Sequence, residues 1–110
     1  MTDDTLMRTM LFDFYGELLT GKQREYYDLH YNEDLSLHEI AEHSGVSRQA
    51  VWDIIRRAQA AMTELEKKTG FVERAVRRRH MLEEIADEAQ KLPDCPQKRR
   101  IIELLGALED

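Results

Sequence analysis

The sequence of 110 residues has one cysteine, two prolines and no long hydrophobic run. The single cysteine, Cys95, excludes an internal disulfide, and such sparse use is typical of a reducing compartment. No apolar stretch is long enough to span a bilayer, and no basic segment followed by an apolar one indicates a signal peptide. We therefore expect a cytoplasmic protein without membrane insertion, folded as one compact unit with a helical extension.

Arrangements of residues that are typical of enzymes are also missing. The sequence has no glycine-rich loop to hold a phosphate and no Ser-His-Asp arrangement, and Cys95 lacks a visible base partner. His38 and His43 are five positions apart, about 140° around a helix, so they cannot share a metal as a pair four positions apart would. We expect a protein that is not an enzyme and that has no cofactor or metal.

The sequence also lacks a surplus of positive charge. It has 16 Lys and Arg residues and 22 Asp and Glu residues, which gives a net charge of −6. Much of the affinity of DNA-binding proteins comes from phosphate neutralisation, so strong non-specific binding to DNA is not expected. Positive charge is nevertheless concentrated locally, which allows a few phosphate contacts per subunit. The basic clusters lie at residues 22–24, 48–57, 77–79 and 98–100.

The charged groups of the last forty residues allow two interpretations. The clusters at 77–79 and 98–100 can form a second nucleic-acid surface, including one for RNA, or they can be solvated charges balanced by nearby acids. Four carboxylates resemble a metal or acid–base cluster, but cations at four-residue spacing favour a solvated helix face with ion pairs. The pairs at this spacing are Glu83 with Arg79 and Asp87 with Lys91, alongside Glu84 and Glu88.

Residues 36–57, SLHEIAEHSGVSRQAVWDIIRR, have the residue types and spacing of a helix-turn-helix motif. Ser36 and Glu39 form a capping box, which predicts a helix that begins directly after the serine. Gly45 can take a positive φ and end this helix in a sharp turn, and Ser47 caps the next helix. The alternative is a tight helical hairpin with a solvated charged face.

The second helix of this motif is predicted to present a DNA-reading face. Apolar residues at helical spacing form its inward side, and polar residues remain on the outward side. Near the start of the helix, Arg48, Gln49 and Ser47 can bond to base edges or phosphates. Arg56 and Arg57, two turns further along, are better placed for phosphates. The inward residues are Ala50, Val51, Ile54, Ile55 and Ala58, and the candidate DNA-binding residues are Ser47, Arg48, Gln49, Trp52, Asp53, Arg56 and Arg57, with Lys22 on a preceding helix.

Two residues of this face have more than one possible role. Trp52 can touch a thymine methyl group or a sugar, or it can pack on a neighbouring helix or a partner protein. Asp53 can accept a hydrogen bond from a cytosine amino group, or it can pair with Arg57 four residues on.

Helices are also expected on both sides of the motif. Thr5 can cap a first helix, which Gly16 weakens. The apolar stripe of this helix is Leu6, Met10, Leu11, Phe14 and Leu18. Thr20 caps a second helix over residues 22–31. The second helix of the motif continues to Gly70, about 22 residues or 33 Å. Helices over residues 71–92 and 97–108 follow, with Pro93 and Pro96 breaking the chain between them. We expect a DNA-binding domain at 1–70 and, at 71–110, an extension that completes the core and pairs with a second copy.

Residues 19–69, LTGKQREYYDLHYNEDLSLHEIAEHSGVSRQAVWDIIRRAQAAMTELEKKT, resemble the promoter-reading region 4 of bacterial sigma factors. In a chain of this size, SLHEIAEHSGVSRQAVWDIIRR is similar to the YlxM-type proteins, small bacterial helix-turn-helix proteins. The resemblance runs from about Leu6 to the end of the long helix. It implies an all-α fold, a sigma-region-4-like helix-turn-helix bundle with extra C-terminal helices. It also implies a regulatory role tied to the signal recognition particle pathway, because the family's genes often neighbour those of its GTPases.

The sequence therefore predicts a sequence-specific regulator that binds double-stranded DNA, as a homodimer. Two reading helices about one DNA turn apart could then address a pseudo-palindrome. The alternative is an adaptor that uses the same fold to bind a protein or RNA of the secretion machinery, including signal recognition particle components. The acidic balance and the extra C-terminal helices motivate this alternative.

Overall fold

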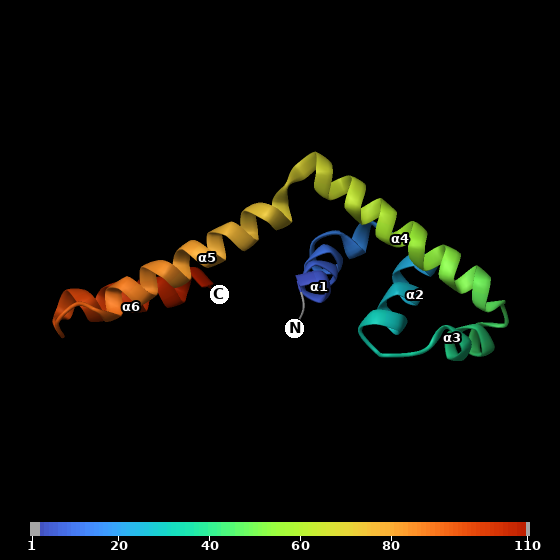
Figure 1. Ribbon diagram of the computed structural model, residues 1–110, viewed down its shortest axis with the longest axis horizontal. Helices are drawn as coiled ribbons and strands as arrows, with labels where there is room; N and C mark the ends of the chain where they lie inside the picture. The colour runs from blue at the N-terminus through green and yellow to red at the C-terminus, as the bar shows by residue number, and fades with distance from the viewer. Residues whose placement is uncertain (1–2, 110) are drawn as a thin grey trace. The chain divides into compact units, whose positions relative to one another are not determined.

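A computed structural model describes residues 3–109, which form six α-helices and one short 3-10 helix, without a strand (Figure 1). The all-α fold predicted from the sequence is confirmed. The elements are α1 (Asp3–Tyr15), η1 (Gly16–Leu18), α2 (Gly21–Tyr31), α3 (Leu37–Ser44), α4 (Arg48–Thr69), α5 (Phe71–Gln90) and α6 (Pro96–Glu109). The chain divides into two compact units, a first unit that ends at Gly70 and a second unit that begins at Phe71. No helix in the described part of the chain is long and apolar enough to cross a membrane.

The long helix α4 is the centre of the first unit, and α1, α2 and α3 all pack against it. Its buried positions recur every three or four residues, which places them along one side of the helix. Apolar and aromatic side chains of the shorter helices fill the space on that side. The buried residues of this core are Leu11, Tyr15, Tyr26, Tyr27, Ile40, Ala41, Val51, Ile55, Ala58 and Met62.

Two tyrosine hydroxyls tie α1 and α2 to the second half of α4. The Tyr27 hydroxyl donates to Gln59 Oε1 at 2.6 Å, and its ring stacks on Phe12 with centroids 5.5 Å apart. Burial raises the pKa of Tyr27 to about 12. The Tyr15 hydroxyl donates to Glu66 Oε1 at 2.6 Å. These contacts hold the second half of α4 against α1 and α2.

The first helix differs from its prediction in its start, its end and its buried side. It has begun by Asp3, so Thr5 lies inside α1 rather than at its cap, and the Thr5 carbonyl accepts from the Thr9 hydroxyl. The helix ends at Tyr15, and the chain continues from Gly16 as η1. Phe14 and Leu18, predicted to face the core, are 45% and 70% exposed, whereas Tyr15 is 3% exposed. The tyrosine is drawn inward because its hydroxyl meets polar groups at the end of α4.

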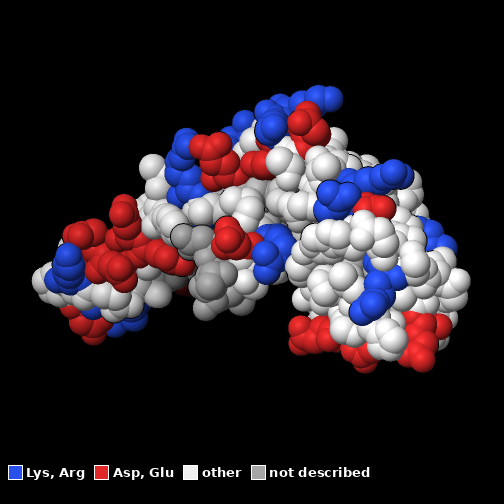
Figure 2. Space-filling model, turned by 45° about the vertical axis from the view of Figure 1, so that its right-hand side comes forward, with Lys and Arg blue, Asp and Glu red and all other residues white. Residues whose placement is uncertain are grey.

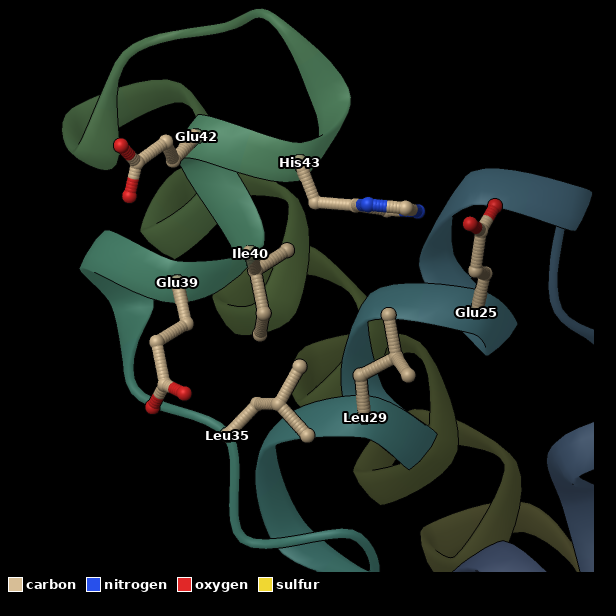
Figure 3. Close-up of a pocket in the computed structure, with 7 residues that line it drawn as sticks. All are labelled: Glu25, Leu29, Leu35, Glu39, Ile40, Glu42 and His43. Carbon is tan, nitrogen blue, oxygen red and sulfur yellow. The ribbon is translucent and has the colours of Figure 1, made fainter.

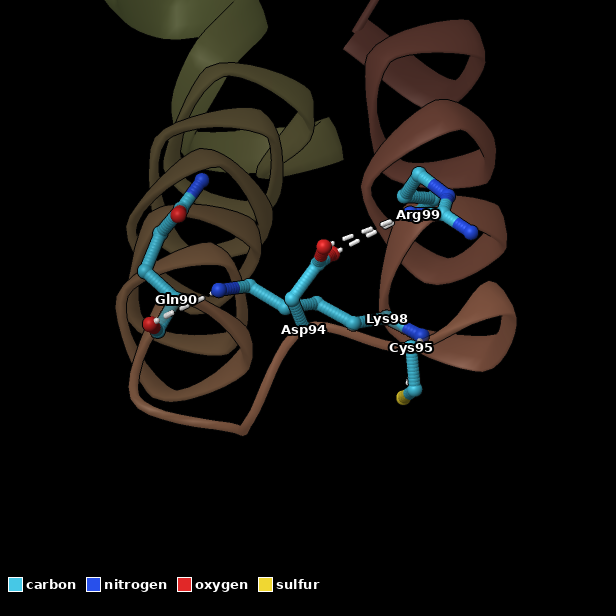
Figure 4. Close-up of polar contacts among 5 residues, drawn as sticks. All are labelled: Gln90, Asp94, Cys95, Lys98 and Arg99. Carbon is cyan, nitrogen blue, oxygen red and sulfur yellow. Dashed lines mark hydrogen bonds and ion pairs between the residues drawn. The ribbon is translucent and has the colours of Figure 1, made fainter.

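The second unit is a hairpin of α5 and α6 whose connection is held by polar contacts (Figure 4). Lys98 Nζ donates to the carbonyl oxygen of Gln90 at 3.2 Å, which satisfies an acceptor at the end of α5. Arg99 Nη1 lies 3.3 Å from Asp94 Oδ1, and Cys95 Sγ accepts from the Lys98 backbone N–H at 3.4 Å. The cysteine therefore occupies the capping position of α6.

Two details of this hairpin correct the sequence interpretation. Pro96 is the first residue of α6 instead of a break before it, because a helix's first position needs no backbone N–H. Lys91 pairs with Glu88 at 2.9 Å rather than with Asp87, since side chains three residues apart are also neighbours on a helix. The acidic residues of α5 are exposed, as the interpretation of a solvated face requires.

Candidate nucleic-acid interface

The turn between α3 and α4 has the local geometry that the sequence predicts. Ser36 Oγ accepts from the Glu39 backbone N–H at 3.1 Å, and Glu39 Oε1 accepts from the Ser36 N–H at 3.0 Å, which confirms the capping box. These hydrogen bonds hold the pKa of Glu39 below its usual range. Gly45 has a φ of 73°, and its N–H donates to the Ala41 carbonyl at 2.9 Å. Ser47 Oγ then accepts from the Ala50 N–H at 3.0 Å and starts α4.

The outward residues at the start of α4 form what we call the α4 face. Val51, Ile55 and Ala58 on the opposite side are 0–1% exposed, so the direction of the face is fixed by the core. Ala50 and Ile54, predicted to face inward, are only half-buried. The α4 face consists of Ser47, Arg48, Gln49, Arg56 and Arg57, which are exposed, and Trp52 and Asp53, which are half-buried.

Asp53 links two other residues of the α4 face. Gln49 Nε2 donates to Asp53 Oδ1 at 3.0 Å, and Arg56 Nη2 donates to the same oxygen at 2.9 Å. The bonds from Arg56 and then Gln49 hold the pKa of Asp53 below its ordinary value. The structure pairs Asp53 with Arg56, three residues on, instead of with Arg57 as predicted, and the charge of Arg57 acts on the carboxylate from beyond ion-pair distance. Within residues 3–109, Arg48 and Arg57 have no ion-pair partner closer than 4.0 Å.

Trp52 packs on a neighbouring helix along one edge and lines a surface hollow with the rest of its ring. Its indole meets the His30 ring of α2 edge-on, with centroids 6.5 Å apart and an interplanar angle of 75°. The hollow, of about 480 Å³, is also lined by Leu37, Arg48 and Gln49. Apolar surface from the start of α3 and hydrogen-bond donors from α4 thus meet at one place.

Leu37 and His30 are the residues of this region that sequence reasoning missed. An apolar residue at helical spacing is assigned to the core by default, and Leu37 follows that pattern although it is only half-buried. His30 gives no signal in the sequence. Its Nδ1 lies 2.8 Å from the Leu35 carbonyl and donates to it, which holds the ring beside Trp52.

Lys22 lies apart from these contacts, in the first turn of α2. Its ammonium nitrogen is 4.0 Å from Glu25 Oε2 and 5.5 Å from the centroid of the Tyr26 ring, both on the same helix. Charges of both signs are interspersed over the face seen in Figure 2, and acidic side chains gather on the unit formed by α5 and α6. The surface seen there has no broad basic region.

The two histidines of α3 are separated as their spacing predicts. His38 Nε2 lies 3.4 Å from Glu42 Oε2, whereas His43 lines a groove toward α2. Among the described residues, no three His, Cys, Asp or Glu side chains are grouped so as to hold a metal ion.

A capped helix, a glycine turn and a second capped helix with an exposed polar face define a helix-turn-helix protein. The chain belongs to the UPF0122 family, whose sequence model, described as "Putative helix-turn-helix protein, YlxM / p13 like", matches residues 2–102. The resemblance to YlxM-type proteins is thereby confirmed, and this is a family of regulatory type rather than of enzymes.

Relatives of the same family are similar over most of their length. A UPF0122 protein of Halalkalibacterium halodurans is 41% identical over 99% of this chain and 100% of its own. One from Symbiobacterium thermophilum is 48% identical over 89% of this chain and 91% of its own. A third, from Shouchella clausii, is 51% identical over 77% and 78% of the two chains.

Proposed function

We propose that this protein binds double-stranded DNA with the first turns of α4 in the major groove. The observation that carries the proposal is the α4 face, a line of polar side chains at a capped helix start whose opposite side is buried. Arg48 and Gln49 bond to base edges near the helix start, and Ser47 to a base or phosphate. Trp52, which lines the surface hollow, contacts a thymine methyl group or a sugar with its ring.

Phosphate contacts come from Arg56, Arg57 and Lys22, which gives few contacts for each subunit. Asp53 keeps the positive charge of the face low, because it already accepts from Gln49 and Arg56. The carboxylate weakens binding to every sequence, and only a site whose bases satisfy Arg48 and Gln49 compensates for it. A weak electrostatic attraction to DNA is what the net charge of −6 predicts. It suits a protein that binds selected sequences, which is also what the resemblance to sigma region 4 implies.

The second unit supports a homodimer. Large apolar side chains of this unit are exposed by 37–57%. They are four and seven residues apart in and just after α5, and three and four residues apart on α6. A second copy covers them and brings a second α4 face to the same duplex, about one DNA turn away. These residues are Met81 and Ile85 on α5, Leu92 in the connection after α5, and Ile101, Leu104 and Leu108 on α6. In analytical ultracentrifugation, the wild type is expected to sediment at twice the monomer mass and Leu104→Glu at the monomer mass. Equal masses for the two proteins contradict the dimer.

Selection of duplexes from a random pool, followed by fluorescence anisotropy, tests DNA binding. On the selected duplex, Arg48→Ala is expected to weaken binding by about 1–3 kcal/mol and to relax the preference at one position. Arg57→Ala is expected to weaken binding to all duplexes alike. Arg100→Ala, whose side chain pairs with Glu103 in the second unit, is the matched control and leaves affinity unchanged. A pool without enrichment, or equal losses for all three variants, overturns the proposal.

A second candidate function is an adaptor in the cytoplasm for a protein or RNA of the secretion machinery. The acidic balance and the second unit favour it, because a single helix-turn-helix needs neither of them to enter the major groove. Co-purification with signal recognition particle protein or RNA that persists in Arg48→Ala and Arg57→Ala supports this function. Loss of every such component under gentle washing contradicts it.

A further inference from the structure

A groove of about 550 Å³ lies between α2 and α3, formed by residues outside the α4 face (Figure 3). Its floor is apolar, because Leu29 of α2, Leu35 of the connecting loop and Ile40 of α3 point toward one another. Ile40 is fully buried, whereas the two leucines stay partly exposed. The volume falls in the range of about 300–1,000 Å³ typical of ligand sites, so the groove has room for several apolar side chains.

The floor is held in place by hydrogen bonds of the loop between the two helices. The Leu35 backbone N–H donates to the Leu29 carbonyl at 3.0 Å. The Leu35 carbonyl in turn accepts from His30 Nδ1 at 2.8 Å. Because both peptide groups of the loop residue are bonded to α2, the groove exists before any partner arrives.

The rim of the groove is acidic. Glu25, Glu39 and Glu42 are among its lining residues. In Figure 3 the His43 ring points toward Glu25, whereas the exposed Glu42 carboxylate points away from the apolar floor. The side chains of Glu25 and Glu42 are 50% and 75% exposed. Their contacts are at the long end of the ion-pair range, 4.0 Å to Lys22 Nζ and 3.4 Å to His38 Nε2, so these exposed pairs are weak.

The third carboxylate is fixed in position. Glu39 Oε1 accepts from the Ser36 N–H at the start of α3, and its hydrogen bonds favour the charged form. It therefore presents a negative charge at a defined place on the rim. Three carboxylates around an apolar floor repel phosphate groups, which excludes nucleic acid and anionic lipid as occupants.

We propose that this groove binds a cationic amphipathic segment of a partner protein. Apolar side chains of the segment cover Leu29 and Leu35, which stay partly exposed, and its Lys or Arg side chains pair with the three glutamates. The site goes beyond DNA binding, since it gives the first unit a second surface of opposite charge. A helix-turn-helix unit with both surfaces joins a protein to a DNA site.

A synthetic peptide tests the proposal with the full-length protein. The probe is a labelled 14-residue peptide of Leu and Lys in amphipathic helical order, and its comparators are a scrambled peptide of the same composition and one with Glu in place of Lys. Binding of the amphipathic basic peptide alone is expected. Equal binding of the scrambled peptide, or no binding of the probe, overturns the proposal.

Charge-neutral variants locate the site. The groove variant, Glu25→Gln with Glu39→Gln and Glu42→Gln, keeps the capping box because glutamine also accepts from the Ser36 N–H. The groove variant is expected to bind the probe about tenfold more weakly, because three exposed ion pairs with the peptide are lost. The matched control makes the same change in charge on exposed carboxylates of α5, and it is expected to change affinity less than about twofold. The control variant is Glu83→Gln with Glu84→Gln and Glu88→Gln.

Hydrogen exchange of the wild type gives an independent readout that needs no variant. The probe is expected to protect the backbone amides of residues 29–43. Protection elsewhere, or equal losses in the groove and control variants, contradicts the assignment. Arg48→Ala separates this site from the DNA-binding face, because it is expected to weaken binding to the selected duplex while its affinity for the peptide stays unchanged.

Discussion

Replacing Asp53 with asparagine is expected to strengthen DNA binding. The α4 face carries three arginines and one aspartate, so the change raises its charge from +2 to +3. Asparagine keeps an oxygen that can accept from Gln49, which preserves the local arrangement. The substitution therefore changes the charge of the face more than its shape.

The size of the effect follows from the distance between Asp53 and a bound phosphate. Arg56 Nη2 lies 2.9 Å from Asp53 Oδ1, so a phosphate on the same guanidinium is about 6 Å from the carboxylate. In water, repulsion at about 6 Å corresponds to about a threefold change in dissociation constant. Release of Arg56 from its pair adds about a further twofold, and the salt dependence becomes steeper by about one unit or less.

The pH dependence of this difference has a defined sign. The folded protein holds the pKa of Asp53 below its usual range, so the carboxylate stays charged above that range. The difference between the wild type and Asp53→Asn is therefore constant between about pH 5 and 8 and disappears only as pH falls through the lowered pKa.

Anisotropy titrations with a selected and a random duplex measure the effect. Asp34→Asn is the matched control, since Asp34 is an exposed loop residue with a φ of 59° that asparagine accepts. It is expected to leave affinity nearly unchanged, whereas Asp53→Asn tightens both duplexes to the same extent. Weaker binding of all duplexes, or a loss confined to one cytosine position, refutes this role for Asp53.

Three further predictions concern stability. Ile55→Ala is expected to lower the free energy of unfolding by about 2–5 kcal/mol, because the side chain is 1% exposed; a urea midpoint equal to that of the wild type contradicts this packing. Gly45→Ala is expected to lower the melting temperature, because a φ of 73° costs alanine about 1–2 kcal/mol of folding free energy. Gly106→Ala, inside α6, is expected to raise the melting temperature. A higher melting temperature for Gly45→Ala than for Gly106→Ala contradicts the turn geometry. Tyr27 stays protonated to about pH 12, so its stabilising effect, present below pH 10.0, is lost as pH rises from 10.0 to about 12. Tyrosinate absorbance should include a component that titrates near pH 12, and the absence of that component contradicts the burial of Tyr27.

The helix boundaries around the motif were predictable because their signals are local. The capping box of Ser36 and Glu39, the positive φ of Gly45 and the cap at Ser47 all involve residues adjacent in the sequence. The end of α4 at Thr69 is of the same kind, since Gly70 also takes a positive φ. Local chemistry of this type depends little on how the helices later pack.

Features that depend on packing were not predictable. The buried side of α1 is set by the bond from Tyr15 to Glu66, which lies 51 positions away. Asp53 has possible partners three and four residues on, and the sequence does not choose between them. The groove combines Leu29, Leu35 and Ile40 from a helix, a loop and a second helix, so no single periodic pattern contains it.

The salt dependence of binding to a selected duplex, measured for the wild type and Arg57→Ala in parallel, tests direct contact between the α4 face and DNA. With three cationic phosphate contacts for each subunit, the logarithm of the binding constant should fall against the logarithm of salt concentration with a slope of about −3 for each bound subunit, or about −5 for a dimer on the duplex. Removal of the Arg57 guanidinium should reduce this slope by about one unit for each bound subunit. Absence of binding to any duplex at about 50 mM salt, or an unchanged slope for Arg57→Ala, would contradict DNA binding through this face.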